Sequence, residues 1–162
     1  MAVIADTSPL NYLILIGMDE VLAGLYRQVL IPEEVLRELQ HPDSPKVVAE
    51  WAAQLPAWVE VVPSSTLTIE AELADLDPGE RSAIALAKTH QSSVLLIMDD
   101  RKGRRESERQ GIPTVGTLGV LQDAATLGLV NLPAAFARLR QTSFRAPDDL
   151  MTALLEADAK RG

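Results

Sequence analysis

The chain contains no cysteine and only two histidines, His41 and His90, in 162 residues. The absence of cysteine excludes disulfides, zinc–thiolate sites and catalysis by a thiol. The shortage of histidine argues against a histidine-rich metal site and leaves oxygen-ligand chemistry with hard cations open. Tryptophan, tyrosine and phenylalanine occur twice each, too few for the stacking surface that single-strand binders often display. We therefore expect Trp51 and Trp58 to pack in the interior.

Long apolar runs are also missing. No run approaches the roughly 20 residues of a membrane span, and no basic region precedes the N-terminal apolar residues as it does in a secretory signal. We therefore expect a cytoplasmic protein that does not contact a membrane. The length fits a single domain, 1–162. Its segment 131–162 is expected to be a C-terminal helical extension, whose apolar residues either cover the sheet or form a homodimer.

Positive charge is scarce, because the formal net charge is −8. This balance argues against generic nucleic-acid binding, which favours basic surfaces. A local basic cluster nevertheless stands out, made of Arg101, Lys102, Arg104, Arg105 and Arg109, and a looser group contains Arg138, Arg140 and Arg145. Such a cluster either holds a phosphate backbone or is a solvated helix face with salt-bridge partners.

Short apolar runs predict strands at 3–5, 29–31, 59–62, 94–98 and 112–115, mostly followed by helical patterns. The strands are continuously apolar rather than alternating, which is typical of a parallel sheet covered on both faces. We therefore predict a three-layer α/β/α sandwich with a mostly parallel sheet of about four or five strands. A short helix is expected at 68–76, with Ile69 and Leu73 facing inward.

Acidic residues occur where several of these elements begin or end. Asp6 follows the first strand and Asp99 follows the fourth, so the two face each other if their strands are neighbours. Glu80 begins the helix that leads to the fourth strand, and Glu38 lies in the helix after the second. Converging carboxylates repel unless a cation joins them, and oxygen ligands alone favour Mg²⁺ or Mn²⁺. Such an ion clamps phosphates and activates water.

Each acid also has a purely structural interpretation. Asp6 can be simply the N-cap of the helix that follows it, with no ligand to bind. Asp77 and Glu80 match a capping box, with proline at the first helical position. Glu38 shares a helix face with Glu34, and both can lie at a solvated edge.

Five segments in order resemble the PIN-domain superfamily, the ribonuclease fold of VapC-type toxins, and more closely a little-characterised prokaryotic branch of it. They are VIADTSPL (3–10), IPEEVLREL (31–39), LDPGERSAIALA (76–87), LLIMDDRKGR (95–104) and GIPTVGTLGVL (111–121). The resemblance covers about residues 3–121. It implies a PIN-like sandwich and a Mg²⁺- or Mn²⁺-dependent endoribonuclease.

The resemblance also implies roles for individual residues. The implied catalytic acids are Asp6, Glu38, Glu80 and Asp99, and the implied metal ligands are Asp6, Glu80, Asp99 and the neighbouring Asp100. The implied hydroxyls beside a ligand, water or phosphate are Thr7, Ser8 and Thr117, and the implied phosphate contacts are Arg101, Lys102, Arg104 and Arg105. Many relatives carry another acid after the fifth strand, where this chain has Gly116 and Thr117.

These expectations lead to a principal hypothesis and two alternatives. The first is a ribonuclease with an RNA substrate and, in its narrower form, a toxin with a small antitoxin partner. The second is a catalytically weak or inactive PIN-fold interaction module, which the missing fifth-strand acid and the acidic balance favour. A receiver-like phosphoacceptor fits worse, because its paired acids follow the first strand, whereas here the pair follows a late one.

Overall fold

The computed structural model describes residues 1–161, without the side chain of Glu72. Gly162, the last residue of the expected single domain and of its helical extension, lies outside the described residues. The strands are β1 (Ala2–Ala5), β2 (Val29–Pro32), β3 (Val59–Val62), β4 (Val94–Ile97) and β5 (Thr114–Val115). They form one five-stranded sheet in the order β3-β2-β1-β4-β5, and every pair is parallel.

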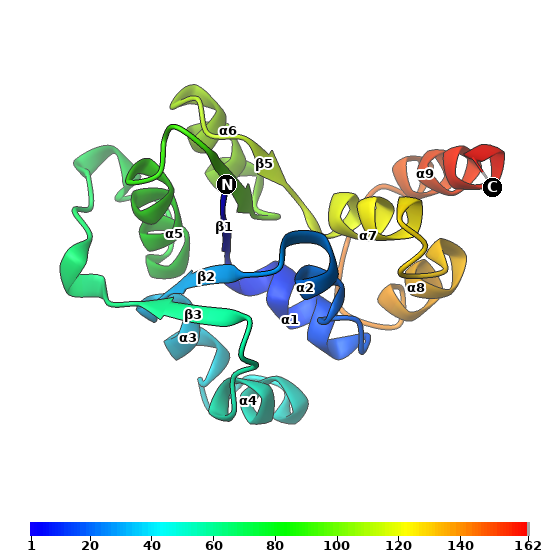
Figure 1. Ribbon diagram of the computed structural model, residues 1–162, viewed down its shortest axis with the longest axis horizontal. Helices are drawn as coiled ribbons and strands as arrows, with labels where there is room; N and C mark the ends of the chain where they lie inside the picture. The colour runs from blue at the N-terminus through cyan, green and yellow to red at the C-terminus, as the bar shows by residue number, and fades with distance from the viewer. Residues whose placement is uncertain (162) are drawn as a thin grey trace.

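Helices connect the strands and cover both faces of the sheet (Figure 1). They are α1 (Thr7–Leu15), α2 (Val21–Tyr26), α3 (Glu33–Leu39), α4 (Lys46–Ala53), α5 (Pro78–Lys88), α6 (Arg101–Arg109), α7 (Thr117–Thr126), α8 (Leu132–Leu139) and α9 (Asp148–Arg161), with 3₁₀ turns at Ser64–Thr66 (η1) and Ala71–Leu73 (η2). The predicted three-layer α/β/α sandwich with a parallel sheet is confirmed.

Several helix ends follow from their local sequence. The predicted capping box begins α5, because the Glu80 N–H donates to Asp77 Oδ1 at 2.8 Å and the Asp77 N–H donates to Glu80 Oε1 at 3.1 Å. The Asn131 side chain caps α8 by accepting from the Ala134 N–H at 2.9 Å. Gly128 follows α7 with a φ of 75°, a left-handed conformation that glycine adopts without a steric penalty.

Two separate apolar clusters lie on the two faces of the sheet. The larger includes Val3 and Ala5 of β1 and Ile97 of β4, packed against α1, α2, α7 and α8. The smaller includes Ile4 of β1, with Leu96 and Met98, packed against α5. Successive strand residues therefore point to opposite faces, as the period of two requires. Trp51 and Trp58 pack against the larger cluster, as expected.

The segment 68–76 differs from its expected helix. Only the single turn η2 forms there, Leu73 is fully buried, and Ile69 is 44 % exposed. A segment this short, with only Leu73 and Leu76 buried, covers too little apolar surface to stabilise an isolated helix. The fifth strand is also shorter than the predicted 112–115, since Ile112 and Pro113 precede β5.

Within residues 1–161, no helix has the length and apolarity that crossing a bilayer requires. This finding agrees with the lack of long apolar runs in the sequence.

Candidate active site at the carboxyl edge of the sheet

The strand order brings the first and fourth strands together. β1 pairs directly with β4, with Ala5 opposite Ile97, and the Asp6 N–H donates to the Ile97 carbonyl at 2.9 Å. From β1 the chain continues to β2 and β3 on one side and later to β4 and β5 on the other. The β1–β4 boundary is therefore a topological switch point, the place where open parallel sheets bind ligands outside their carboxyl ends.

Asp6 lies at this boundary and is almost fully buried, with 4 % of its surface exposed. It occupies the N-cap position of α1 without a side-chain capping bond, and Oδ1 has no hydrogen-bond partner among the described residues. A carboxylate that served only as a cap would make that bond. A buried oxygen without a partner is costly, so the cap-only interpretation does not explain this side chain.

Electrostatics set Asp6 apart as well. Burial raises the pKa of the Asp6 carboxyl well above its usual value, and the Thr7 N–H offsets this only in part. The nearby carboxyls of Asp77, Glu80 and Glu38 raise the pKa of Asp6 further. Asp6 therefore lies in a local field of negative charge that a cation would neutralise.

Glu38 reaches this field from α3. Its Oε1 accepts from the Thr7 hydroxyl, and its Oε2 accepts from the Gly79 N–H at 3.0 Å. A Cβ at position 79 would lie 2.4 Å from Glu38 Oε1, so the carboxylate packs against a place that only glycine leaves free. Burial raises the pKa of Glu38, and Asp77 raises it further, against the lowering by the Thr7 hydroxyl. Glu38 is thus held at the site and does not lie at a solvated edge.

Glu80 combines its capping role with a buried position, since only 8 % of the residue is exposed. Burial raises the pKa of Glu80 to about 7, with further increases from the charges of Asp77 and Asp100. The Asp77 N–H, by donating to the carboxylate, lowers the pKa of Glu80 in part. The capping role and a role in the acidic site therefore coexist in one side chain.

Asp99 and Asp100 point to different faces of the sheet. Ile97 belongs to the cluster beneath α7, so Asp99, two residues further on, extends toward α7; its Oδ1 and Oδ2 accept from the N–H and hydroxyl of Thr117, at 2.7 and 2.6 Å. Met98 belongs to the cluster beneath α5, and Asp100 accordingly lies near Glu80. Asp100 is exposed and also caps α6 by accepting from the Gly103 N–H at 2.8 Å.

Burial raises the pKa of Asp99, while the two Thr117 bonds and the positive charge of Arg104 lower it in part. Thr117 is fully buried, so its hydroxyl is positioned for this one carboxylate. Thr117 therefore donates a hydroxyl hydrogen bond to Asp99. It occupies the place after the fifth strand where the resemblance would place a further acid.

The geometry separates the expected residues into two groups. Glu38 and Glu80 both act on the pKa of Asp6, whereas Asp99 is held on the α7 side. Sequence reasoning treated Asp77 only as a helix cap, although its charge acts on each of the three. Its capping motif gave no signal of this second role.

A hard divalent cation fits the chemistry of this donor set, which consists of carboxylate oxygens and includes the unpartnered Oδ1 of Asp6. Among the described residues, however, no three acidic or histidine side chains converge closely enough to enclose one ion. The hydrogen bonds of Glu38 and Glu80 hold those carboxylates in other contacts. Enclosing one ion therefore requires these acids to move closer together than they lie here.

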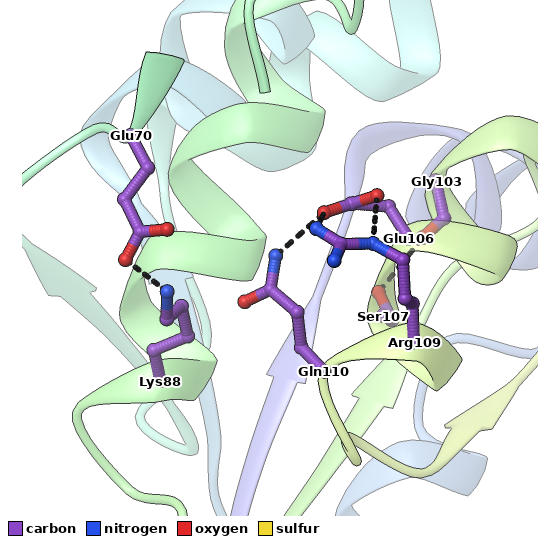
Figure 2. A network of polar contacts seen from close by, with 7 residues as sticks. All are labelled: Glu70, Lys88, Gly103, Glu106, Ser107, Arg109 and Gln110. Carbon is purple, nitrogen blue, oxygen red and sulfur yellow. Dashed lines mark hydrogen bonds and ion pairs between the residues drawn. The ribbon is translucent and has the colours of Figure 1, made fainter. Parts of the chain in front are cut away.

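The remaining expected residues lie around this edge. Thr7 bonds Glu38, and Ser8 is exposed without a side-chain bond to another described residue. On α6, Arg104 is partly buried near Asp99, while Arg101, Lys102 and Arg105 are exposed. Figure 2 shows that Arg109, further along α6, is paired with Glu106. The first half of α6 therefore carries the cations that are open to a ligand.

Comparison with known families places the chain in a described family. A family model described as a PIN domain matches residues 2–160, nearly the whole chain. No curated protein sequence matches the chain.

Proposed function

The chain belongs to the PIN-domain family, whose members are generally nucleases, and from this premise we propose that it is a metal-dependent ribonuclease that hydrolyses RNA phosphodiester bonds. The main support for the proposal is the environment of the Asp6 carboxylate. Its Oδ1 is buried without a hydrogen-bond partner and lies in the negative field of neighbouring carboxylates. Burying an unpaired carboxylate oxygen among other acids destabilises the fold and brings no benefit to a neutral interaction surface. In a cation site, the same oxygen is free to bind the ion.

The residues that would hold Mg²⁺ or Mn²⁺ are Asp6 and Glu80, with Asp99 and Asp100 as the acids after β4. When bound, such an ion lowers the pKa of a water ligand and neutralises charge on a phosphoryl oxygen. Of the two acids after β4, Asp100 shares the face of Asp6 and Glu80, which favours it as the closer ligand. Asp99 then acts from the α7 side, held by Thr117.

The other side chains of the site position these groups. Thr7 and the Gly79 N–H orient Glu38, and the Asp77 N–H orients Glu80. With its pKa near 7, Glu80 exchanges a proton readily around neutral pH, the property expected of a group that accepts or supplies one. Arg104, near Asp99, is placed to contact a phosphate of the substrate.

Cleavage of a labelled single-stranded RNA with Mn²⁺, Mg²⁺ or EDTA tests this proposal. We expect cleavage only with a divalent cation, and a loss of at least a hundredfold in Asp6→Asn. Asp43→Asn is the matched control, because the Asp43 side chain is 92 % exposed. Equal cleavage by Asp6→Asn and the control, in preparations purified in parallel, would refute the assignment.

The biological role that fits a ribonuclease of this family is that of a toxin. We propose a cytoplasmic toxin whose activity a small antitoxin protein suppresses, with a homodimer as the assembly; the resemblance to VapC-type toxins supports this. Growth arrest on induction of the wild-type chain, absent for Asp6→Asn, is the expected result. Normal growth at matched protein levels would instead favour an RNA-processing role.

The second candidate function is an inactive interaction module. It is favoured by the lack of a closed group of three acids within the described part and by Thr117 at the fifth-strand position. This alternative predicts no thermal stabilisation by Mn²⁺. The ribonuclease proposal predicts a rise in melting temperature, since an ion that binds only the folded state stabilises it by mass action.

A further inference from the structure

Two cavities meet beside Asp99. The first, of about 350 Å³, lies between β5, the start of α7 and the segment 144–154. The second, of about 330 Å³, lies along α6 and is lined by three cations and two acids: Arg101, Arg104, Arg105, Asp99 and Glu108. Asp99 and Arg104 line both cavities, so the two adjoin at these residues. Each has a volume typical of sites that bind small molecules or parts of larger ones.

The first cavity combines an apolar wall with positive charge. Phe144, Leu118 and Leu154 line it, and Arg104 and Arg145 are also on its wall. Arg145 is exposed, and its guanidinium donates to the Phe144 carbonyl at 3.0 Å, which keeps the cation beside the aromatic residue. An aromatic surface flanked by cations is the combination that binds a nucleobase and its phosphates.

The second cavity is charged rather than apolar. Arg101 and Arg105 are exposed and form no ion pair with any residue in the range 1–161. These cations therefore remain available to a polyanion, although the chain as a whole is acidic.

Gly116 makes room for the two side chains that line both cavities. A Cβ at Gly116 would lie 2.8 Å from Asp99 Oδ1 and 3.0 Å from Arg104 Nη1, so glycine leaves room for both side chains. On the opposite wall, α9 lies beside α7 (Figure 1) and contributes only Met151 to the buried core. The C-terminal helix thus forms one side of the cavity without filling it.

We propose that the two cavities form one groove for single-stranded RNA, in which phosphates lie along the arginines and one unstacked base enters the cavity beside Phe144. The choice of RNA rests on the ribonuclease proposal. A duplex does not fit this arrangement, because its bases are stacked inside and cannot enter an apolar cavity. An acidic peptide would satisfy the arginines but would show no dependence on a base.

Binding is measured by fluorescence anisotropy with a short unstructured RNA, in EDTA and in Ca²⁺. We expect Arg145→Gln to weaken binding about tenfold and to reduce the slope of log affinity against log salt by about 0.7. Arg140→Gln is the matched control, because it makes the same charge change at an exposed residue outside both cavities. Equal effects of the two variants, or no RNA binding in either buffer, would overturn the groove.

The binding of one base beside Phe144 is tested with a set of RNAs, each of which lacks the base at a different position. In the wild-type chain, one abasic position should weaken binding about tenfold. Phe144→Leu keeps the apolar bulk and removes the stacking surface, so this variant should bind the intact and that abasic RNA almost equally. If Phe144→Leu does not fold, Ala146→Leu narrows the same cavity without removing an aromatic residue. Equal affinities for all the abasic RNAs would contradict the proposal. The same holds if an acidic peptide displaces the RNA and no base affects binding.

Cleavage and binding are measured separately, so that the ribonuclease proposal and the groove can fail independently. Base-dependent binding without Mn²⁺-dependent cleavage refutes the ribonuclease proposal and supports the groove. Cleavage with an unchanged KM in Arg145→Gln supports the ribonuclease and refutes the groove.

Discussion

Replacing Glu80 by glutamine should stabilise the metal-free protein, because Glu80 is a buried acid with several negative neighbours. Its pKa is raised from 4.5 to about 7. At 1.36 kcal/mol per pKa unit, keeping it ionised in the folded state costs about 3 kcal/mol at alkaline pH. Glutamine retains the oxygen that accepts from the Asp77 N–H, so the capping box survives. The shifted pKa already includes the favourable contacts of the carboxylate, so the expected stabilisation is about 3 kcal/mol at pH 8.

The sign of this effect depends on pH. Because the folded-state pKa is the higher one, protonation favours folding, and the penalty is absent below pH 4.5 and complete above about pH 7. Urea unfolding at pH 8 and pH 4 measures both limits, and the two proteins should be equally stable at pH 4. Glu50→Gln, with a side chain 63 % exposed, serves as the control and should change stability by at most about 0.5 kcal/mol.

Saturating Mn²⁺ should reverse this order, since the ion binds the wild-type carboxylate and the native state gains the binding free energy. A Glu80→Gln protein that is less stable than wild type at pH 8, or whose advantage is the same at both pH values, would refute the reasoning.

Two further predictions test individual contacts. Thr117→Val removes the hydroxyl that donates to Asp99 at 2.6 Å and should cost about 1–3 kcal/mol in the free energy of unfolding at pH 7. Thr126→Val, at an exposed position of α7, is its control, and equal urea midpoints for the two variants would contradict the assigned role. Leu73→Ala should cost about 2–5 kcal/mol because Leu73 is fully buried, whereas Ile69→Ala should cost less than about 1 kcal/mol. Equal costs would instead support the helix that the sequence predicted there.

Local sequence patterns accounted for much of the fold. The apolar runs located the strands because the central ones, β1, β2 and β4, are largely buried, although the edge strands β3 and β5 are partly exposed. The capping box of α5 depends only on residues within one turn. The order of the strands is not local. The sequence placed Asp6 and Asp99 at strand ends, but only the β1–β4 pairing shows that these ends are neighbours.

Side-chain direction at the site was harder to predict. The resemblance implied Asp99 as a catalytic acid and both Asp99 and Asp100 as metal ligands. The alternation along β4 instead separates them, because Asp99 turns toward Thr117 and Asp100 toward Glu80. The position of Asp77 near Asp6 likewise depends on how α5 packs against the sheet. A tertiary contact of this kind leaves no pattern in the sequence.

The cavity beside Phe144 shows the same limit. The residues that enclose it come from β5, α7 and the segment 144–154, which the sequence does not connect. Several of its apolar members belong to the C-terminal segment, for which the sequence left two roles open, covering the sheet or forming a homodimer. Nothing in their spacing indicated an opening next to Asp99.

The central claim is that the carboxylates at the β1–β4 edge hold a divalent cation. The most direct test is an anomalous difference map from crystals of the wild-type protein grown with Mn²⁺. We predict a peak coordinated by Asp6 Oδ1, together with at least one of Glu80 and Asp100, and no peak at that position in Asp6→Asn crystals. Strong manganese peaks at other sites of the chain with none at Asp6 would contradict the account.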